Sequence, residues 1–306
     1  MTAVHTAAGW DAQRLASWSG PHLAGVEAAL SAWVGVDAPV QLGDAMRYAV
    51  LDGGKRLRPL LVLAASEAVG GVAAAALRAA CATELIHAYS LVHDDLPCMD
   101  NDVLRRGKPT VHVQFGEADA LLAGDALQAL AFELLTPDDD SVAPAVQAAL
   151  CRLLARAAGS QGMAGGQAID LASVGLALND AQLREMHRLK TGALLQGSVD
   201  MGAACAQQVT PQALAALSAY GAALGLAFQV VDDILDVVAD SQTLGKTAGK
   251  DAAADKPTYV SLLGLDGARA QATQLLGEAL AALERSGLAD TNALRALAHM
   301  VVDRDR

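Results

Sequence analysis

The longest uncharged stretch of the chain, residues 201–231, most limits how this protein can fold. A membrane-spanning helix needs about 20 apolar residues, so the stretch is long enough to be one. However, two glutamines and Pro211 interrupt its first third, and Asp232 follows it directly without a basic flank. We therefore predict a buried core helix and no membrane span.

The composition favours helices throughout. Hydrophobic residues make up 53% of the 306 residues and aromatic residues only 3%, so Ala and Leu dominate the apolar content. Both have high helix propensity, and runs of β-branched residues are scarce. The breaks between apolar segments are short, and no linker divides the chain. We predict an all-α fold of about ten helices, with residues 1–306 forming a single domain.

The overall charge and the cysteines argue against several classes of function. With a net charge of −12, the chain lacks the basic face that a nucleic-acid-binding protein needs. Its four cysteines show no CxxC spacing, which argues against a zinc site or a disulfide framework. The first residues lack a basic start followed by an apolar segment, so no signal peptide is expected. These features predict a cytoplasmic protein with reduced thiols.

Two clusters of aspartates each follow an apolar segment. The first is DDLPCMDND, with Asp94, Asp95, Asp100 and Asp102, and the second is DDILD, with Asp232, Asp233 and Asp236. Like charges this close need a compensating cation. Carboxylates without His or Cys suit Mg²⁺ or Mn²⁺. An acidic helix end facing water would explain one cluster, but two of them favour a metal site.

The two clusters differ in spacing. Asp232 and Asp236 are four residues apart and share one face of a helix. Asp94 and Asp100 are six apart, and the proline between them disfavours helix at the preceding residue. We predict that the helix breaks near residues 96–98 and that an extra turn returns Asp100 to the side of Asp94.

Basic residues gather beside the acidic and glycine-rich breaks. They occur in GGKRLRP at 53–59, in RRGK at 105–108, in KTGALL at 190–195 and at three lysines between 246 and 256. Mg²⁺ held by one or two carboxylates completes its shell with water and phosphate, so these cations should mark a bound phosphate. The apolar helices would line a hydrocarbon tail. The residues thus predict a Mg²⁺-dependent site for a diphosphate with a hydrocarbon tail.

These motifs together resemble the trans-isoprenyl diphosphate synthases, and most closely the bacterial farnesyl diphosphate synthases. The similar segments, within residues 44–265, are GGKRLRP, HAYSLVHDDLPCMDNDVLRRGKPTVH, GDAL, KTGALL and GLAFQVVDDILDVV…LGKTAGKD…KPTY. The resemblance implies an isoprenoid synthase bundle around a central cavity and a homodimer. It also implies 1'-4 condensation of isopentenyl diphosphate with dimethylallyl or geranyl diphosphate to farnesyl diphosphate. Val103 stands where family members often have an acid.

The resemblance also implies a role for each residue of the site. About three Mg²⁺, replaceable by Mn²⁺, would bind Asp94, Asp95, Asp100, Asp232, Asp233 and Asp236. The allylic diphosphate would contact Arg105, Lys190, Thr191, Gln229, Lys246 and Lys256. Isopentenyl diphosphate would contact Gly54, Lys55, Arg58, His87 and Arg106. Ionisation of the allylic substrate would depend most on Asp94, Asp95, Asp100, Arg105, Lys190, Asp232 and Lys246.

Two residues before the first cluster would set the product length. Tyr89 and Ser90 precede Asp94 by five and four residues, so Tyr89 lies about 7 Å along the helix from the metal. In the family that this sequence resembles, an aromatic residue at this position is typical of bacterial farnesyl synthases. A geranylgeranyl diphosphate synthase remains an alternative. A terpene cyclase is disfavoured by DDILD and GGKRLRP, and a non-catalytic prenyltransferase subunit by the presence of both aspartate motifs.

Overall fold

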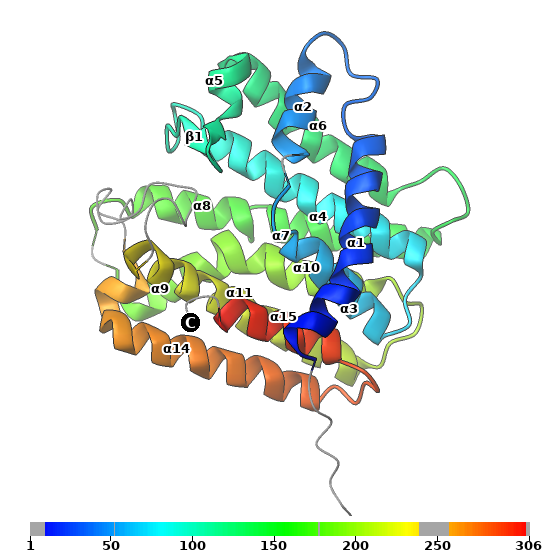
Figure 1. Cartoon of the computed structure of the whole chain (residues 1–306), viewed down its shortest axis with the longest axis vertical. Helices are drawn as coiled ribbons and strands as arrows, with labels where there is room; N and C mark the ends of the chain where they lie inside the picture. Colours follow the sequence, from blue (N-terminus) through cyan, green and yellow to red (C-terminus); the bar gives the residue numbers. More distant parts are fainter. Residues whose placement is uncertain (1–9, 52, 177, 239–256, 304–306) are drawn as a thin grey trace, which may run out of the picture.

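The computed structural model describes residues 10–51, 53–176, 178–238 and 257–303, and regular structure in these ranges is almost entirely helical (Figure 1). The helices are α1 (Ala12–Trp33), α2 (Leu42–Val50), α3 (Leu57–Ala68), α4 (Ala73–Asp94), α5 (Val111–Phe115), α6 (Glu117–Leu135), α7 (Pro144–Ala158), α8 (Met163–Ala172), α9 (Asp180–His187), the π-helical turn η1 (Arg188–Gly192), α10 (Ala193–Ala204), α11 (Pro211–Val238), α14 (Tyr259–Glu284) and α15 (Asn292–Val302). Two short strands, β1 (Leu104–Arg105) and β2 (Lys108–Pro109), form an antiparallel hairpin. The predicted all-α class is confirmed.

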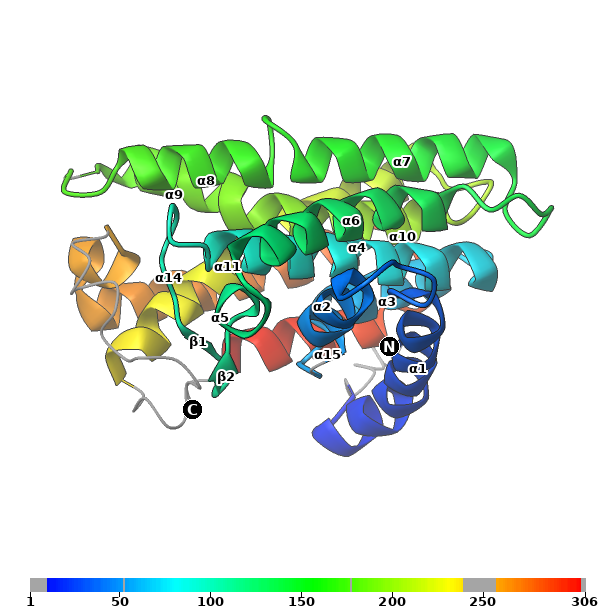
Figure 2. The same cartoon turned by 90° about the horizontal axis from the view of Figure 1, so that it is seen from above.

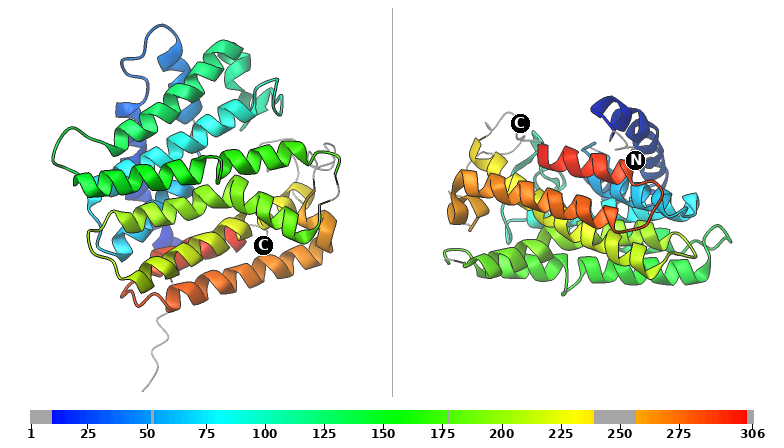
Figure 3. Two further views of the ribbon diagram at one scale, coloured as in Figure 1. Left: turned by 180° about the vertical axis from the view of Figure 1, so that it is seen from behind. Right: turned by 90° about the horizontal axis from the view of Figure 1, so that it is seen from below.

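The helices form a layered bundle. α4, α10 and α11 lie between α7 and α8 on one face and α1, α3 and α15 on the other (Figure 2). α7 and α8 run end to end, as the views from above and from behind both show (Figures 2 and 3). The C-terminal ends of α4 and α11 lie at the same end of the bundle as the β1–β2 hairpin (Figures 1 and 2). Both aspartate clusters therefore belong to one end of the molecule.

The central position of α4 follows from its small side chains. Most of its residues between Ala75 and Ala88 are buried, because alanines let α3 and α6 approach it from different sides. One hydrophobic core is built mainly from α1, α2, α4, α6 and α7, and a second mainly from α3, α10, α11, α14 and α15. The N-terminal half of α4 thus packs as core, and its last turn carries the acidic motif.

The uncharged stretch at 201–231 is divided between two helices. α10 ends at Ala204, and α11 begins at Pro211, a residue that suits the first turn of a helix. By length and composition α11 could cross a membrane, but 61% of its most apolar window is buried inside the protein. It packs against α14 and α10. The predicted core helix is present, and it carries the second aspartate cluster in its last turns.

Two glycines allow neighbouring helices to touch the turn η1. A Cβ on Gly166 of α8 would lie 2.0 Å from the Lys190 backbone nitrogen, and one on Gly225 of α11 would lie 2.7 Å from Gly192 Cα. No side chain fits at these separations. The glycines therefore bring α8 and α11 against the two sides of η1, which presents Lys190 and Thr191.

Candidate active site

The first aspartate cluster lies where α4 ends. The helix stops at Asp94, and the Asp100 backbone N–H donates to the Asp94 carbonyl at 2.8 Å. The predicted turn is thus present. Burial raises the pKa of Asp94 to about 6, against the opposing effect of Lys190, and nearby Asp100 raises it further. The acids of this cluster are thus crowded and partly buried, and the predicted compensating metal ion stays a prediction.

The hairpin that follows this turn positions two arginines. Arg106 and Gly107 have φ of 52° and 78°, and two successive positive φ values are what a two-residue type I′ turn requires. Before the turn, Arg105 binds the buried Asp95 through two hydrogen bonds, from Nε to Oδ2 at 2.8 Å and from Nη2 to Oδ1 at 2.6 Å. After it, Thr110 Oγ1 donates to the Asp102 carbonyl at 2.7 Å. The hairpin is thereby fixed against the end of α4.

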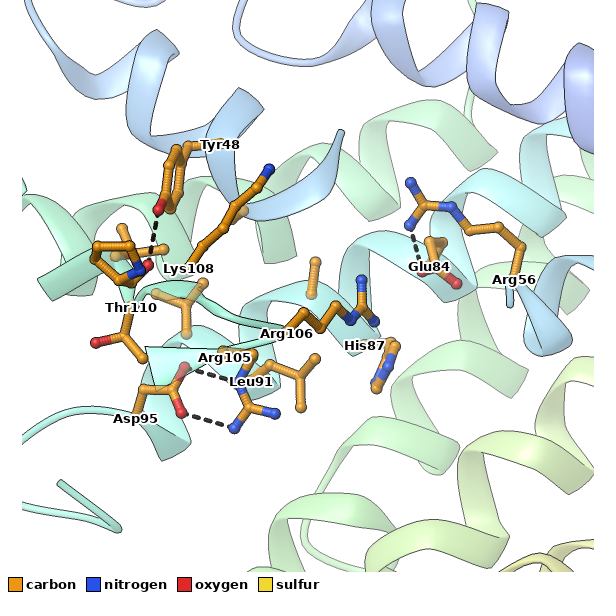
Figure 4. A pocket seen from close by; sticks show the side chains of 15 residues that line it. Tyr48, Arg56, Glu84, His87, Leu91, Asp95, Arg105, Arg106, Lys108 and Thr110 are labelled. Carbon is orange, nitrogen blue, oxygen red and sulfur yellow. Dashed lines mark hydrogen bonds and ion pairs between the residues drawn. The ribbon is translucent and has the colours of Figure 1, made fainter. Parts of the chain in front are cut away.

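A pocket with a cationic wall lies beside the hairpin. Its cavity volume is about 40 Å³, and its lining includes Tyr48, Arg56, Glu84, His87, Leu91, Asp95, Arg105, Arg106, Lys108 and Thr110 (Figure 4). Arg106 Nη1 donates to the Gly53 carbonyl at 2.7 Å. A Cβ on Gly54 would lie 2.9 Å from the same Nη1. The second glycine of GGKRLRP therefore leaves the space that this guanidinium occupies.

The electrostatics of the pocket favour an anion. Burial lowers the pKa of Arg58 to about 10, with Glu84 opposing and Arg106 adding to the shift. Burial also lowers the pKa of His87 well below its usual value, and Arg58, Arg106 and Arg105 lower it further. His87 is therefore a neutral imidazole among guanidinium groups. A bound diphosphate would relieve the repulsion between these cations.

A second set of polar side chains surrounds η1. Lys190 Nζ donates to Asp170 Oδ2 of α8 at 2.6 Å, and Asp170 is only 4% exposed. Thr191 Oγ1 donates to Gln229 Oε1 of α11 at 2.9 Å. The charge of Lys190 also opposes the rise in the pKa of Asp94 at the end of α4. The hydrogen bonds of this set thus link η1 to α8 and to α11.

The second aspartate cluster lies on α11, next to the start of α14. Asp233 Oδ1 accepts from Gln229 Nε2 at 2.9 Å, and its Oδ2 accepts from the Tyr259 backbone N–H at 2.8 Å. His187 stacks on the Tyr259 ring, and burial lowers the pKa of His187 to about 4. Asp233 thus connects α11 to the first turn of α14.

The aspartates fit Mg²⁺ bound together with a substrate. Among the described residues, no three acidic, histidine or cysteine side chains converge into a preformed metal cage. Mg²⁺ commonly takes one or two carboxylates and completes its octahedron with water and substrate phosphate oxygens. Two separate carboxylate sets at one end of the bundle match that mode of binding.

Tyr89 stands on α4 between the acidic motif and the first hydrophobic core. Its ring meets His93 edge-on with centroids 5.6 Å apart and packs against the first hydrophobic core. Burial raises the pKa of its hydroxyl, with the Gln128 side chain of α6 opposing the shift. A Cβ on Gly124 would lie 2.1 Å from His93 Nε2, so the glycine of GDAL makes room for the imidazole. Ser90 Oγ donates back to the His87 carbonyl at 2.9 Å.

The structure brings most of the predicted residues to this end of the bundle, whereas Lys246 and Lys256 lie outside the described residues. Val103, at the hairpin, is 58% exposed. The sequence interpretation missed Glu84 and Asp170, the buried partners of the basic residues. A usable signal existed, because each is the only acid in an otherwise uncharged segment, residues 79–92 and 157–179 respectively.

Comparison with known proteins gives consistent matches over most of the chain. The sequence model of the polyprenyl synthetase family matches residues 39–296. Farnesyl diphosphate synthase of Haemophilus influenzae is 48% identical over 262 residues, which cover 85% of this chain and 88% of that protein. The chloroplastic geranylgeranyl pyrophosphate synthase of Catharanthus roseus is 47% identical over 281 residues, covering 92% and 78%. The solved geranyltransferase of Helicobacter pylori, complexed with magnesium and isoprenyl diphosphate, superposes with a TM-score of 0.83 at 34% identity, covering 94% and 96%.

Proposed function

Because the chain belongs to the polyprenyl synthetase family, we propose that it is a prenyltransferase that makes farnesyl diphosphate. It joins isopentenyl diphosphate head to tail to dimethylallyl or geranyl diphosphate. The observation that carries this proposal is the Asp95–Arg105 ion pair, which stands between two sets of polar groups. One set lines the pocket beside the hairpin, called the arginine pocket because Arg56, Arg105 and Arg106 line it. The other set surrounds η1 and α11.

Each of the two sets binds one of the two diphosphates. In this proposal the arginine pocket binds isopentenyl diphosphate through Gly54, Lys55, Arg58, His87 and Arg106. The allylic diphosphate contacts Arg105, Lys190, Thr191 and Gln229, and also Lys246 and Lys256, which lie outside the described residues. The neutral His87 can donate one ring N–H to a phosphate oxygen without adding to the positive charge.

The aspartates of the two clusters hold the metal in this proposal. When bound, about three Mg²⁺, or Mn²⁺ in their place, neutralise the charge that develops on the departing diphosphate. Asp94 and Asp100, joined by the turn after α4, and Asp232 and Asp236 on α11 supply the main ligands. Asp95 and Asp233 keep oxygen lone pairs for metal, but they already accept hydrogen bonds from Arg105 and from the start of α14.

The reaction needs no nucleophilic side chain. The bond between C1 of the allylic substrate and its diphosphate oxygen breaks, and the oxygen keeps the electron pair. Arg105 and Lys190 stabilise the charge on this leaving group. The C3–C4 double bond of isopentenyl diphosphate, held beside it by Arg58 and Arg106, then bonds through C4 to C1. A proton leaves C2 for the released diphosphate, and the new double bond forms between C2 and C3.

Tyr89 favours the fifteen-carbon product over the geranylgeranyl alternative. Its ring packs against His93 and the first hydrophobic core, so it stands as an obstacle about 7 Å along α4 from the metal end. A growing tail that runs along α4 meets this ring. Similarity to geranylgeranyl synthases does not contradict this proposal, because the two activities share the same chemistry and differ in how far the chain grows.

We further infer a cytoplasmic homodimer. Val113 of α5 and Leu121 and Leu122 of α6 are 49%, 47% and 53% exposed, and these helices pack side by side. Exposed apolar patches mark interaction surfaces, so we assign this face to a second copy of the chain. All four cysteines are free thiols, as suits a reducing compartment.

The test is an assay of the purified protein without any partner protein. We expect condensation of geranyl and isopentenyl diphosphate in Mg²⁺, and its loss in excess EDTA. Release of diphosphate from farnesyl diphosphate alone would indicate a cyclase instead. Absence of turnover from a folded, Mg²⁺-loaded protein would indicate a non-catalytic subunit. Full turnover in EDTA would contradict the assignment of the aspartates.

A further inference from the structure

Arg56 is a buried arginine that lines the pocket but is not among the residues assigned to either diphosphate. It lies within GGKRLRP, between Lys55 and the start of α3, and its side chain is 2% exposed. Its backbone is left-handed, with φ of 45°, a conformation that non-glycine residues rarely adopt. A strained backbone and a buried charge persist only where the surroundings hold them in place.

The guanidinium fastens the loop to three helices. Nε and Nη2 donate to Glu27 Oε1 and Oε2 of α1 at 2.6 and 3.2 Å. Nη1 donates to Glu84 Oε1 of α4 at 2.6 Å, and Nη2 also donates to the carbonyl of Val50, the last residue of α2, at 2.6 Å. An arginine has five N–H groups, and four are used in these contacts. Arg56 therefore has little capacity left to bind a ligand.

Glu84 places a negative charge beside the other arginines. It is 3% exposed and lies one helical turn before His87 on α4. Its charge acts on Arg58 and Arg106 as well as on Arg56. Figure 4 shows Arg56 and Glu84 on the side of the pocket where His87 and Arg106 lie. The Arg56–Glu84 pair thus stabilises the arginines on this side of the pocket.

We propose that Arg56 and Glu84 are positioning residues for the isopentenyl diphosphate site, an inference that rests on the proposed function. Arg56 sets the path of the loop that carries Lys55 and leads into Arg58. Glu84 serves as the counter-charge that keeps the arginines together before a diphosphate binds. Arg56 acts through these neighbours and does not touch the substrate.

The test substitutes Arg56→Lys, which keeps the charge and removes the planar fork. We expect the KM for isopentenyl diphosphate to rise about tenfold, with the KM for geranyl diphosphate and kcat within about threefold of wild type. Glu27→Gln keeps an acceptor at a half-exposed position and should raise the same KM by about threefold. This second variant tests the network if Arg56→Lys does not fold.

Arg47→Lys is the matched control. Arg47 also joins two helices, donating from α2 to the Ser31 and Val34 carbonyls at 2.8 and 3.0 Å, but it does not line the pocket. If Arg56 has only a structural role, both lysine variants should lose stability, and the KM for isopentenyl diphosphate should behave like the KM for geranyl diphosphate. That result would overturn the inference.

Arg58→Ala distinguishes failure of the proposed site from failure of this inference. If it leaves the isopentenyl diphosphate KM unchanged, the proposed site itself is wrong. If it raises that KM while Arg56→Lys and Glu27→Gln do not, only this inference fails.

Discussion

At the scale of single residues, the second aspartate of each DD pair has a different role from its neighbours. Both oxygens of Asp95 bind the Arg105 guanidinium, and both oxygens of Asp233 accept hydrogen bonds, one of them from the Tyr259 backbone. Charge-assisted hydrogen bonds of this kind hold side chains and helix ends in place. In the proposed site, the aspartate motifs would therefore combine metal binding with positioning of the neighbouring elements.

Asp233→Asn and Asp232→Asn should separate these two roles. An asparagine at 233 can still accept from the Tyr259 N–H, and a flipped Gln229 amide can accept from its new N–H₂ group. We expect kcat within about fivefold of wild type for Asp233→Asn and a loss of about 100-fold or more for Asp232→Asn. The measurement is kcat as a function of Mg²⁺ concentration. Equal losses, with equal shifts in the Mg²⁺ requirement, would show that both residues act as metal ligands.

At the scale of helices, the site depends on how closely α8 approaches η1. Gly166 is the contact point, and one turn later Asp170 binds Lys190, whose charge acts on the pKa of Asp94 in the first aspartate cluster. The sequence could show that KTGALL carries a cation. Asp170 could have been noticed as the only acid in an uncharged segment, but its pairing with Lys190 could not be predicted, because the two residues are 20 apart and meet only when α8 packs on η1.

Gly166→Ala should therefore impair both stability and catalysis. The added Cβ meets backbone atoms of Lys190 at 2.0 and 2.4 Å, which cannot move aside as a flexible side chain can. Such overpacking costs about 1–3 kcal/mol of unfolding free energy, and the shift of Lys190 should lower kcat. Gly277→Ala in α14, where the new Cβ meets nothing within 4 Å, is the control and should be neutral or slightly stabilising. Urea unfolding and kcat that match between the two variants would refute the packing argument.

At the scale of the whole molecule, the sequence predicted the all-α fold class and the turn after α4. These features follow from local propensity and from Pro97, so they can be read from short segments. The Arg56–Glu84 pair could not be predicted in this way. It joins residues 28 apart in the chain, and it requires a left-handed arginine, for which local sequence gives no signal.

The assembly gives a prediction at the same scale. If the exposed leucines of α6 form the homodimer interface, Leu122→Glu should convert the dimer into a monomer, because a buried, unpaired charge is costly. Leu214→Glu on α11, at a residue that is 42% exposed, is the control and should stay dimeric. Sedimentation equilibrium distinguishes a chain of 31.2 kDa from its dimer. A dimeric Leu122→Glu variant would place the interface on another face.

The most direct test of the proposed activity is the chain length of the product. The purified protein is incubated with geranyl diphosphate, excess isopentenyl diphosphate and Mg²⁺, and the dephosphorylated alcohols are separated by gas chromatography. The position of Tyr89 predicts a fifteen-carbon main product from the wild type. It predicts twenty carbons or more from Tyr89→Ala, because each additional buried CH₂ gains about 0.8 kcal/mol once the ring is removed. A wild type that makes mainly the twenty-carbon product, or a folded and active Tyr89→Ala that still stops at fifteen, would contradict the proposed role of Tyr89 in limiting the chain length.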